Sequence, residues 1–125
     1  MGTLLITDDR EEIRLLLQEV LETAGHTALT AAGGQETLEI LKKKEVDLVL
    51  LDMKMSGMDG LETLKAAKKS WPFLKIIMMT ACEDLNTLKE TARFGASGYI
   101  CKPFDLEDLR DVVQRELQCR AVPSS

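Results

Sequence analysis

The chain carries five side chains with chemistry of their own at points where short apolar runs end. Two acids follow the first run, one acid follows a central run, and a hydroxyl and an ammonium group end the last two: Asp8, Asp9, Asp52, Thr80 and Lys102. Carboxylates suit Mg²⁺, which takes one or two of them together with water and phosphate. A carboxylate can also be a nucleophile that forms an acyl phosphate, and a lysine can hold a phosphoryl oxygen.

The elements that position these residues follow from the hydrophobic pattern. Short, continuously apolar runs are typical of strands covered on both faces, whereas apolar residues recurring every three or four positions indicate helices. We predict strands over residues 3–7, 27–31, 47–51, 74–79 and 96–101. We predict helices over residues 10–24, 35–44, 59–70, 84–94 and 105–118.

Burial within these elements can also be predicted. We expect one apolar face on the first helix, formed by Ile13, Leu16, Leu17, Val20, Leu21 and Ala24. Leu15 lies roughly 160° from the centre of this face and is expected to point to solvent. The fourth helix has a weaker apolar face, and Cys101 in the last strand is expected to face the core. The members of that weaker face are Leu85, Leu88 and Ala92.

The strict alternation of strand and helix predicts an α/β fold, a (βα)5 doubly wound parallel sheet with helices on both faces. Ligands of such sheets bind beyond the carboxyl ends of the strands, where the five side chains would meet. Two carboxylates 4 Å apart repel by about 4 kcal/mol at an effective dielectric of 20, so three of them need a cation. The pattern therefore predicts a magnesium-dependent site at which Asp52 accepts a phosphoryl group.

Each of these residues has an ordinary alternative explanation. Asp8 and Asp9 are also suited to capping the first helix, Asp52 to a turn, and Lys102 to a solvated surface. The prediction rests on their arrival at one sheet edge from four different strands.

Composition bounds the remaining possibilities. The 125 residues suffice for one domain, and a net charge of −5 argues against direct nucleic-acid binding. No apolar run approaches the roughly 18 residues of a membrane span, and the start of the chain lacks the features of a signal peptide. Three cysteines without a CxxC pattern are expected to be reduced thiols, and we expect a cytoplasmic protein without membrane partners.

Five stretches of the chain stand out together: residues 8–9, 47–52, 58–60, 79–81 and 95–104. They resemble a bacterial response-regulator receiver domain of two-component and phosphorelay signalling. The resemblance runs from about Leu4 to Leu117. It implies a CheY-like, flavodoxin-like fold with strand order 2-1-3-4-5, a receiver over residues 1–119, and a tail or truncated linker over residues 120–125.

The resemblance also implies roles for individual residues. Asp52 takes a phosphoryl group from the phosphohistidine of a histidine kinase or phosphotransfer protein, with Mg²⁺ as the cofactor. The metal ligands are Asp8 (through water), Asp9, Asp52 and the backbone carbonyl of Lys54. Thr80 and Lys102 bind the phosphoryl group, Thr80 and Tyr99 switch a surface of helix 4, strand 5 and helix 5, and the bond before Pro103 is cis. The residues expected to dock the partner are Ile13, Leu16, Pro103 and Phe104.

Two departures from the family pattern and two rival functions stand beside this reading. Thr7 replaces an aliphatic residue, and Ser56 replaces a proline in the loop after the acceptor.

A phosphohydrolase with an aspartyl-phosphate intermediate would place a second acid two residues after the nucleophile, where this chain has Lys54. A flavin-binding domain of similar fold would have a first loop that cradles phosphate, whereas this loop is acidic. A stand-alone relay and a receiver cut from a transcriptional regulator remain open, as do a monomer and a phosphorylation-dependent dimer.

Overall fold

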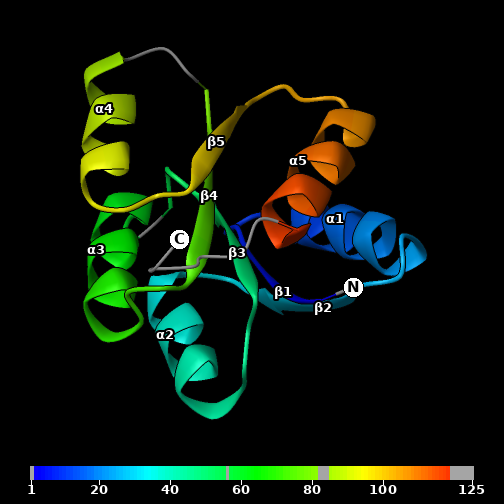
Figure 1. Cartoon of the computed structure of the whole chain (residues 1–125), viewed down its shortest axis with the longest axis horizontal. Helices are drawn as coiled ribbons and strands as arrows, with labels where there is room; N and C mark the ends of the chain where they lie inside the picture. Colours follow the sequence, from blue (N-terminus) through cyan, green and yellow to red (C-terminus); the bar gives the residue numbers. More distant parts are fainter. Residues whose placement is uncertain (1, 56, 82–84, 119–125) are drawn as a thin grey trace.

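A computed structural model describes residues 2–55, 57–81 and 85–118. Five parallel strands form one sheet in the order β2-β1-β3-β4-β5 (Figure 1), which confirms the predicted fold class and strand order. The strands are β1 (Thr3–Thr7), β2 (Thr27–Ala31), β3 (Leu48–Asp52), β4 (Lys75–Thr80) and β5 (Gly98–Cys101). The helices are α1 (Glu11–Thr23), α2 (Gly34–Lys43), α3 (Gly60–Ser70), α4 (Leu85–Arg93) and α5 (Leu106–Gln118).

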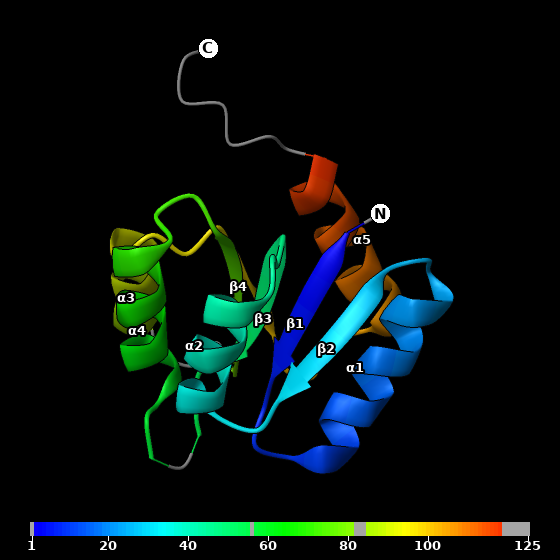
Figure 2. The same ribbon diagram turned by 90° about the horizontal axis from the view of Figure 1, so that it is seen from below.

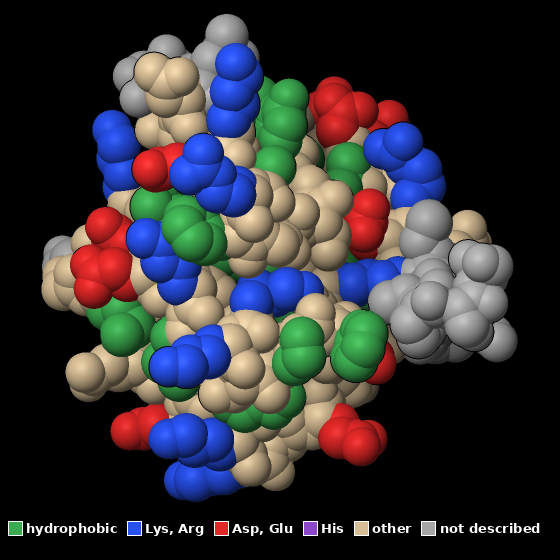
Figure 3. Space-filling view, turned by 60° about the vertical axis from the view of Figure 1, so that its left-hand side comes forward, with side chains coloured by type: hydrophobic (Ala, Val, Ile, Leu, Met, Phe, Trp, Pro, Cys, Tyr) green, Lys and Arg blue, Asp and Glu red, His purple; other side chains and the backbone are tan. Residues whose placement is uncertain are grey.

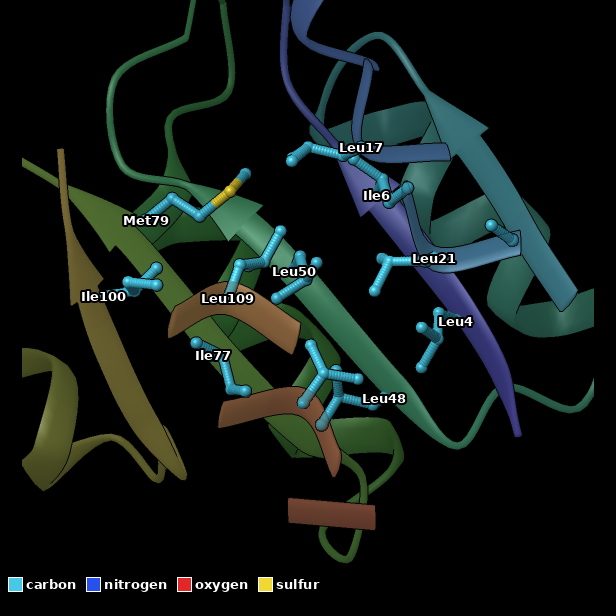
Figure 4. Packing of buried hydrophobic residues seen from close by; sticks show 12 residues of the cluster. Leu4, Ile6, Leu17, Leu21, Leu48, Leu50, Ile77, Met79, Ile100 and Leu109 are labelled. Carbon is cyan, nitrogen blue, oxygen red and sulfur yellow. The ribbon is translucent and has the colours of Figure 1, made fainter. Parts of the chain in front are cut away.

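The helices cover both faces of the sheet, with α1 and α5 on one side and α2, α3 and α4 on the other (Figure 2). Alternate residues of a strand point to opposite faces. Leu4 and Ile6 of β1 therefore pack with Leu17 and Leu109 on the α1–α5 side, as Figure 4 shows. Leu5 packs on the opposite side, in the cluster beneath α2 and α3.

The central strand β3 is buried along its whole length and ends at Asp52. The next helix, α3, begins close beside this end. Asp59 caps it by accepting a hydrogen bond of 2.9 Å from the Glu62 amide. Gly60 permits the approach, because a Cβ at this position would lie 2.7 Å from the Cα of Met53. The strand–loop–helix connection is thus drawn tightly around Asp52.

The burial predictions for α1 were partly wrong. Leu17 and Leu21 are fully buried, but Leu16 is 43% exposed, and Ala24 is also exposed. One residue step turns a helix by about 100°, so Leu16 lies at the margin of the stripe centred on Leu17. Leu15 is exposed as expected, at 56%.

Two further burial predictions were wrong. In α4, Ala92 is exposed and Thr91 is buried in its place, because the Thr91 hydroxyl is satisfied by the Leu88 carbonyl at 2.8 Å. In β5, Ile100 faces the core, so strand alternation turns Cys101 outward. Cys101 is also disulfide-bonded rather than a free thiol. Several predictions fall on residues outside the described ranges. They concern the other two cysteines, the start of α4 at Asp84, Ser56, and the tail over residues 120–125.

Among the helices of the described ranges, none combines the length and the apolar character that a membrane crossing requires.

Candidate functional site

The three predicted acids come together at the carboxyl edge of the sheet. Asp8 and Asp9 follow β1, Asp52 ends β3, and these two strands are hydrogen-bonded neighbours. One carboxylate oxygen from each of the three acids lies within 4.8 Å of the others. Asp8 and Asp52 are buried, whereas Asp9 is exposed, so the cluster opens to solvent on one side.

Lys102 supplies a positive charge to this cluster from the end of β5. Its Nζ lies 2.9 Å from Asp52 Oδ1 and 3.3 Å from Asp8 Oδ2, so one ammonium group bridges two buried carboxylates. The Lys102 amide donates to the Thr80 carbonyl at 2.6 Å, which joins the ends of β4 and β5. The peptide bond between Lys102 and Pro103 is cis.

Asp8 is held by the backbone that follows it. It is fully buried, and its Oδ1 accepts a hydrogen bond of 2.9 Å from the Arg10 amide. The side chain of Arg14 donates to the Asp8 carbonyl at 2.8 Å. The N-cap of α1 is Arg10, and no side-chain cap bond is formed there. Asp8 therefore fixes the loop that leads into α1.

A cavity of about 540 Å³ lies beside the acids at this edge. Its lining includes the exposed acid, the buried acceptor candidate, the predicted hydroxyl and the predicted ammonium group: Asp9, Asp52, Thr80 and Lys102. Arg10, Lys54 and Thr87 also border it. Sequence reasoning missed Arg10 and Thr87 as pocket residues, and only the position of Arg10 directly after the acid pair offered a signal.

The electrostatics of Asp52 favour an added cation. Burial raises the pKa of the Asp52 carboxyl, and the Asp8 charge adds to the rise, while Lys102 and a hydrogen bond from the Lys54 backbone oppose it. A raised pKa means that the ionised form is disfavoured in its surroundings. A divalent cation beside the three acids would favour the ionised, nucleophilic form of Asp52.

The unusual Thr7 has a polar partner inside the protein. Its hydroxyl lies 2.6 Å from the hydroxyl of Thr37 on α2, and both residues are buried. The Thr37 hydroxyl donates its hydrogen to the Gly33 carbonyl at 2.9 Å, so the Thr7 hydroxyl is the donor between the two threonines. The pair joins the end of β1 to the first turns of α2.

The residues expected to switch and to dock differ in exposure. Tyr99 on β5 is 52% exposed. Ile13 and Phe104 are partly buried against the α1–α5 cluster, whereas Leu16 and Pro103 are exposed.

The sequence pattern of the family described as the response regulator receiver domain matches residues 4–114. The chain belongs to the response regulator receiver domain family. This confirms the resemblance inferred from the five stretches of sequence. Receiver domains act in two-component systems with histidine kinases or phosphotransfer proteins, and they bind Mg²⁺ in an acidic pocket. The donor set of Asp8, Asp9 and Asp52 consists of carboxylate oxygens, which fit this ion.

Two curated relatives differ in how much of their length the receiver covers. This chain is 42% identical over 118 residues to sporulation initiation phosphotransferase F of Bacillus subtilis, and the match covers 94% of this chain and 95% of that protein. It is 40% identical over 116 residues to the DNA-binding transcriptional regulator NtrC of Escherichia coli, covering 93% of this chain and 25% of that protein. The chain thus spans nearly all of one relative and about a quarter of the other.

Solved structures show the same fold. The chemotaxis protein CheY4 of Vibrio cholerae superposes with a TM-score of 0.88 at 33% identity, covering 92% of the receiver and 98% of that chain. The receiver domain of NtrX from Brucella abortus superposes with a TM-score of 0.87 at 32% identity, with the same two coverages.

Proposed function

We propose that Asp52 is the phosphoryl acceptor of this receiver. Of the two buried acids, Asp8 does not border the cavity and its Oδ1 is occupied by the Arg10 amide. Asp52 borders the cavity and lies 2.9 Å from the Lys102 ammonium group. This contact carries the proposal, because a nucleophile needs both access for the phosphoryl donor and a nearby cation for the transferred group.

In the proposed reaction, a carboxylate oxygen of Asp52 attacks the phosphorus of a partner's phosphohistidine. An O–P bond forms as the P–N bond breaks, and the imidazole leaves with the bonding electron pair and takes up a proton. Lys102 binds one phosphoryl oxygen and the Thr80 hydroxyl donates a hydrogen bond to another. Such a transfer needs positioning and charge neutralisation more than covalent assistance.

The cofactor of this step is Mg²⁺, which supplies charge neutralisation for the incoming phosphoryl group. Asp9, Asp52 and the backbone carbonyl of Lys54 would hold it directly, and Asp8 would hold it through water. Lys54 supports this assignment, because it follows Asp52 by two residues and borders the same cavity.

The proposed signal leaves the site through Thr80 and Tyr99. Thr80 ends β4. On the neighbouring strand β5, Tyr99 is paired with Met78 of β4, which lies two residues before Thr80. When the Thr80 hydroxyl moves toward the phosphoryl group, Tyr99 turns inward from its exposed position. The surface of α4, β5 and α5 then changes for a downstream partner.

The phosphodonor is a histidine kinase or a histidine phosphotransfer protein, docked on Ile13, Leu16, Pro103 and Phe104. Exposed Leu16 and Pro103 support this surface, since apolar side chains beside a reactive site favour a protein partner. We further propose that the receiver works in the cytoplasm as a signalling switch rather than a turnover enzyme. It either relays phosphate as a stand-alone protein or precedes an output domain, as a monomer or a phosphorylation-dependent dimer.

The test uses a small acyl-phosphate donor and intact mass measurement. Wild type with Mg²⁺ is expected to gain one phosphoryl group, whereas Asp52→Asn or wild type with a chelator gains none. Labelling of Asp52→Asn to the wild-type extent would overturn the assignment. Sustained turnover of many donor molecules per protein would favour the rival phosphohydrolase.

A further inference from the structure

A second concave surface lies at the amino edge of the sheet, opposite the acidic site. Helices in this fold run against the strands, so α2 and α3 end where β3 and β4 begin. The groove between them has a volume of about 630 Å³. Its lining mixes apolar and polar groups; the apolar side chains are Leu41, Val46, Trp71, Phe73 and Leu74, and Lys44 lies at the rim.

Phe73 stands at this groove on a braced turn. It is 68% exposed, the highest value among the large hydrophobic residues of the described chain. The Leu74 amide donates to the Trp71 carbonyl at 3.1 Å across the turn. The Lys68 ammonium group then donates to the carbonyls of Pro72 and Leu74 at 2.7 and 2.8 Å. The aromatic ring is therefore presented on a fixed backbone, and a partner would lose little entropy in binding it.

The position of Phe73 separates it from the other exposed hydrophobic residues. Leu16 on α1 and Tyr99 on β5 belong to the proposed docking and switching surfaces, and Leu15 is the neighbour of Leu16 on α1. A single exposed apolar side chain is common. The apolar surface of Phe73, however, continues over the partly buried Trp71 and Leu74, which pack against the core beneath α3.

Exposed lysines outnumber acids in the segments that border the groove, although the chain is acidic overall. Residues 63–82 contain four lysines and no acid, in a chain with a net charge of −5. The ends of α2 and α3 add an exposed rim of Lys42, Lys43, Lys44 and Lys69. Every salt bridge recorded among the described residues belongs to the acidic site, so these rim lysines have no carboxylate within 4.0 Å there.

Figure 3 shows the face formed by α2, α3 and α4, where Lys and Arg side chains gather with hydrophobic side chains between them. Two acids, Glu45 and Asp47, also line the groove. The Asp47 carboxylate accepts a hydrogen bond of 2.8 Å from the Thr3 amide, whereas Glu45 is exposed beside the rim lysines. An occupant must therefore bring an apolar anchor for the wall and negative charge for the rim.

The geometry points to an acidic segment of a partner protein as the occupant of this groove. An aliphatic or aromatic anchor of the segment packs against Phe73 and Trp71, and flanking carboxylates pair with Lys44 and Lys69. A nucleic acid fits less well, because its binding depends on many lysine–phosphate contacts along a basic surface, whereas this chain is acidic and the groove also presents apolar side chains. The proposal does not depend on the chemistry of Asp52.

Trp71 provides the readout, because it is the single tryptophan of the chain and lines the groove. The full chain is titrated with a tryptophan-free peptide in which Asp and Glu flank a Leu-Leu-Phe anchor, and the Trp71 fluorescence is followed. Saturable binding that weakens as salt rises is expected. Phe73→Ala, and the double variant Lys44→Glu with Lys69→Glu, are each expected to weaken binding at least tenfold.

Control variants distinguish this binding from non-specific binding and from effects at the phosphoryl site. Lys89→Glu reverses the charge of one exposed lysine on α4 and is expected to leave peptide binding unchanged. Asp52→Asn should also bind the peptide normally, while Phe73→Ala should still be labelled by an acyl-phosphate donor, which shows that it folds. The proposal is overturned if the peptide leaves Trp71 unaffected up to millimolar concentration. Equal binding of a lysine-for-acid peptide or of a single-stranded oligonucleotide would overturn it as well.

Discussion

The two edges of the sheet use charged side chains in opposite ways. At the carboxyl edge, Asp8 and Asp52 are buried beside each other and share the ammonium group of Lys102. At the amino edge, charged side chains bond to backbone groups instead. Asp47 accepts from the Thr3 amide, and the Lys68 ammonium group donates to two carbonyls.

This difference separates charges that do chemistry from charges that hold the fold. A charge bonded to backbone dipoles has an environment that no reaction needs to change. The ionised form of crowded carboxylates, by contrast, becomes more favourable when a cation, or a phosphoryl group together with its cation, binds beside them. The comparison predicts that changes at the carboxyl edge depend on pH and Mg²⁺, while changes at the amino edge do not.

The largest expected effect on stability comes from Lys102→Met. Removing one partner of a buried ion pair leaves uncompensated charge and costs on the order of 3 kcal/mol. The folded-state pKa of Asp52 is already raised and rises further without Lys102. The stability contributed by Asp52 is thus present at acid pH and lost as pH rises through the folded pKa. Urea unfolding in a chelator at pH 5 and pH 8 measures this.

The control for that experiment is Lys68→Met at the amino edge. It removes hydrogen bonds to two carbonyls, so its cost should be similar at both pH values. An equal loss for Lys102→Met at pH 5 and pH 8 would contradict the electrostatic account of the site.

The next effect is stabilisation by Mg²⁺. At a concentration of 100 times its dissociation constant, an ion bound only by the folded state stabilises by about 2.7 kcal/mol. Thermal unfolding should therefore shift upward with Mg²⁺ in the wild type and much less in Asp9→Asn. Asp47→Asn alters an exposed carboxylate at the amino edge and should keep the full shift. Loss of the shift in Asp47→Asn would break the comparison.

A smaller effect is expected for Asp47→Ala. The variant loses the 2.8 Å hydrogen bond to the Thr3 amide, which is worth about 1 kcal/mol. Chemical denaturation should show this loss, and acyl-phosphate labelling should proceed at the wild-type rate. Slower labelling would show that the amino edge is coupled to the acceptor.

The smallest effect concerns the lifetime of the acyl phosphate. Lys54 is exposed at the cavity rim, and we propose that its long side chain hinders the approach of water to Asp52. After removal of the donor, Lys54→Asn should therefore lose phosphate severalfold faster than the wild type, as followed by intact mass. Slower loss of phosphate in the variant would contradict this role of Lys54.

Much of the architecture could be predicted from the hydrophobic pattern. The apolar run of β3 indicated a strand buried on both faces, and β3 is the central strand, which brought Asp52 beside the acids of β1. The cluster of Asp8, Asp9 and Asp52 follows from that order of strands, since parallel strands end at a common edge.

Features that depend on what covers an element could not be predicted. Leu16 and Ala92 have apolar side chains at helical spacing, but the neighbouring elements do not cover them. Cys101 is apolar enough for a core, yet Ile100 takes the inward position of β5. The Thr7–Thr37 hydrogen bond joins residues 30 apart in sequence, and no local pattern indicates such a pair. The groove at Phe73 likewise arises only when residues near 44 and 73 meet.

The central claim is that Asp52 alone receives the phosphoryl group, in a site built by the surrounding acids and Lys102. Borohydride reduces an aspartyl phosphate to homoserine, so reduction of the labelled receiver followed by peptide mass mapping locates the acceptor. The account predicts homoserine at position 52, formed only with Mg²⁺ and donor. Homoserine at position 8 or 9, with Asp52 unmodified, would contradict it.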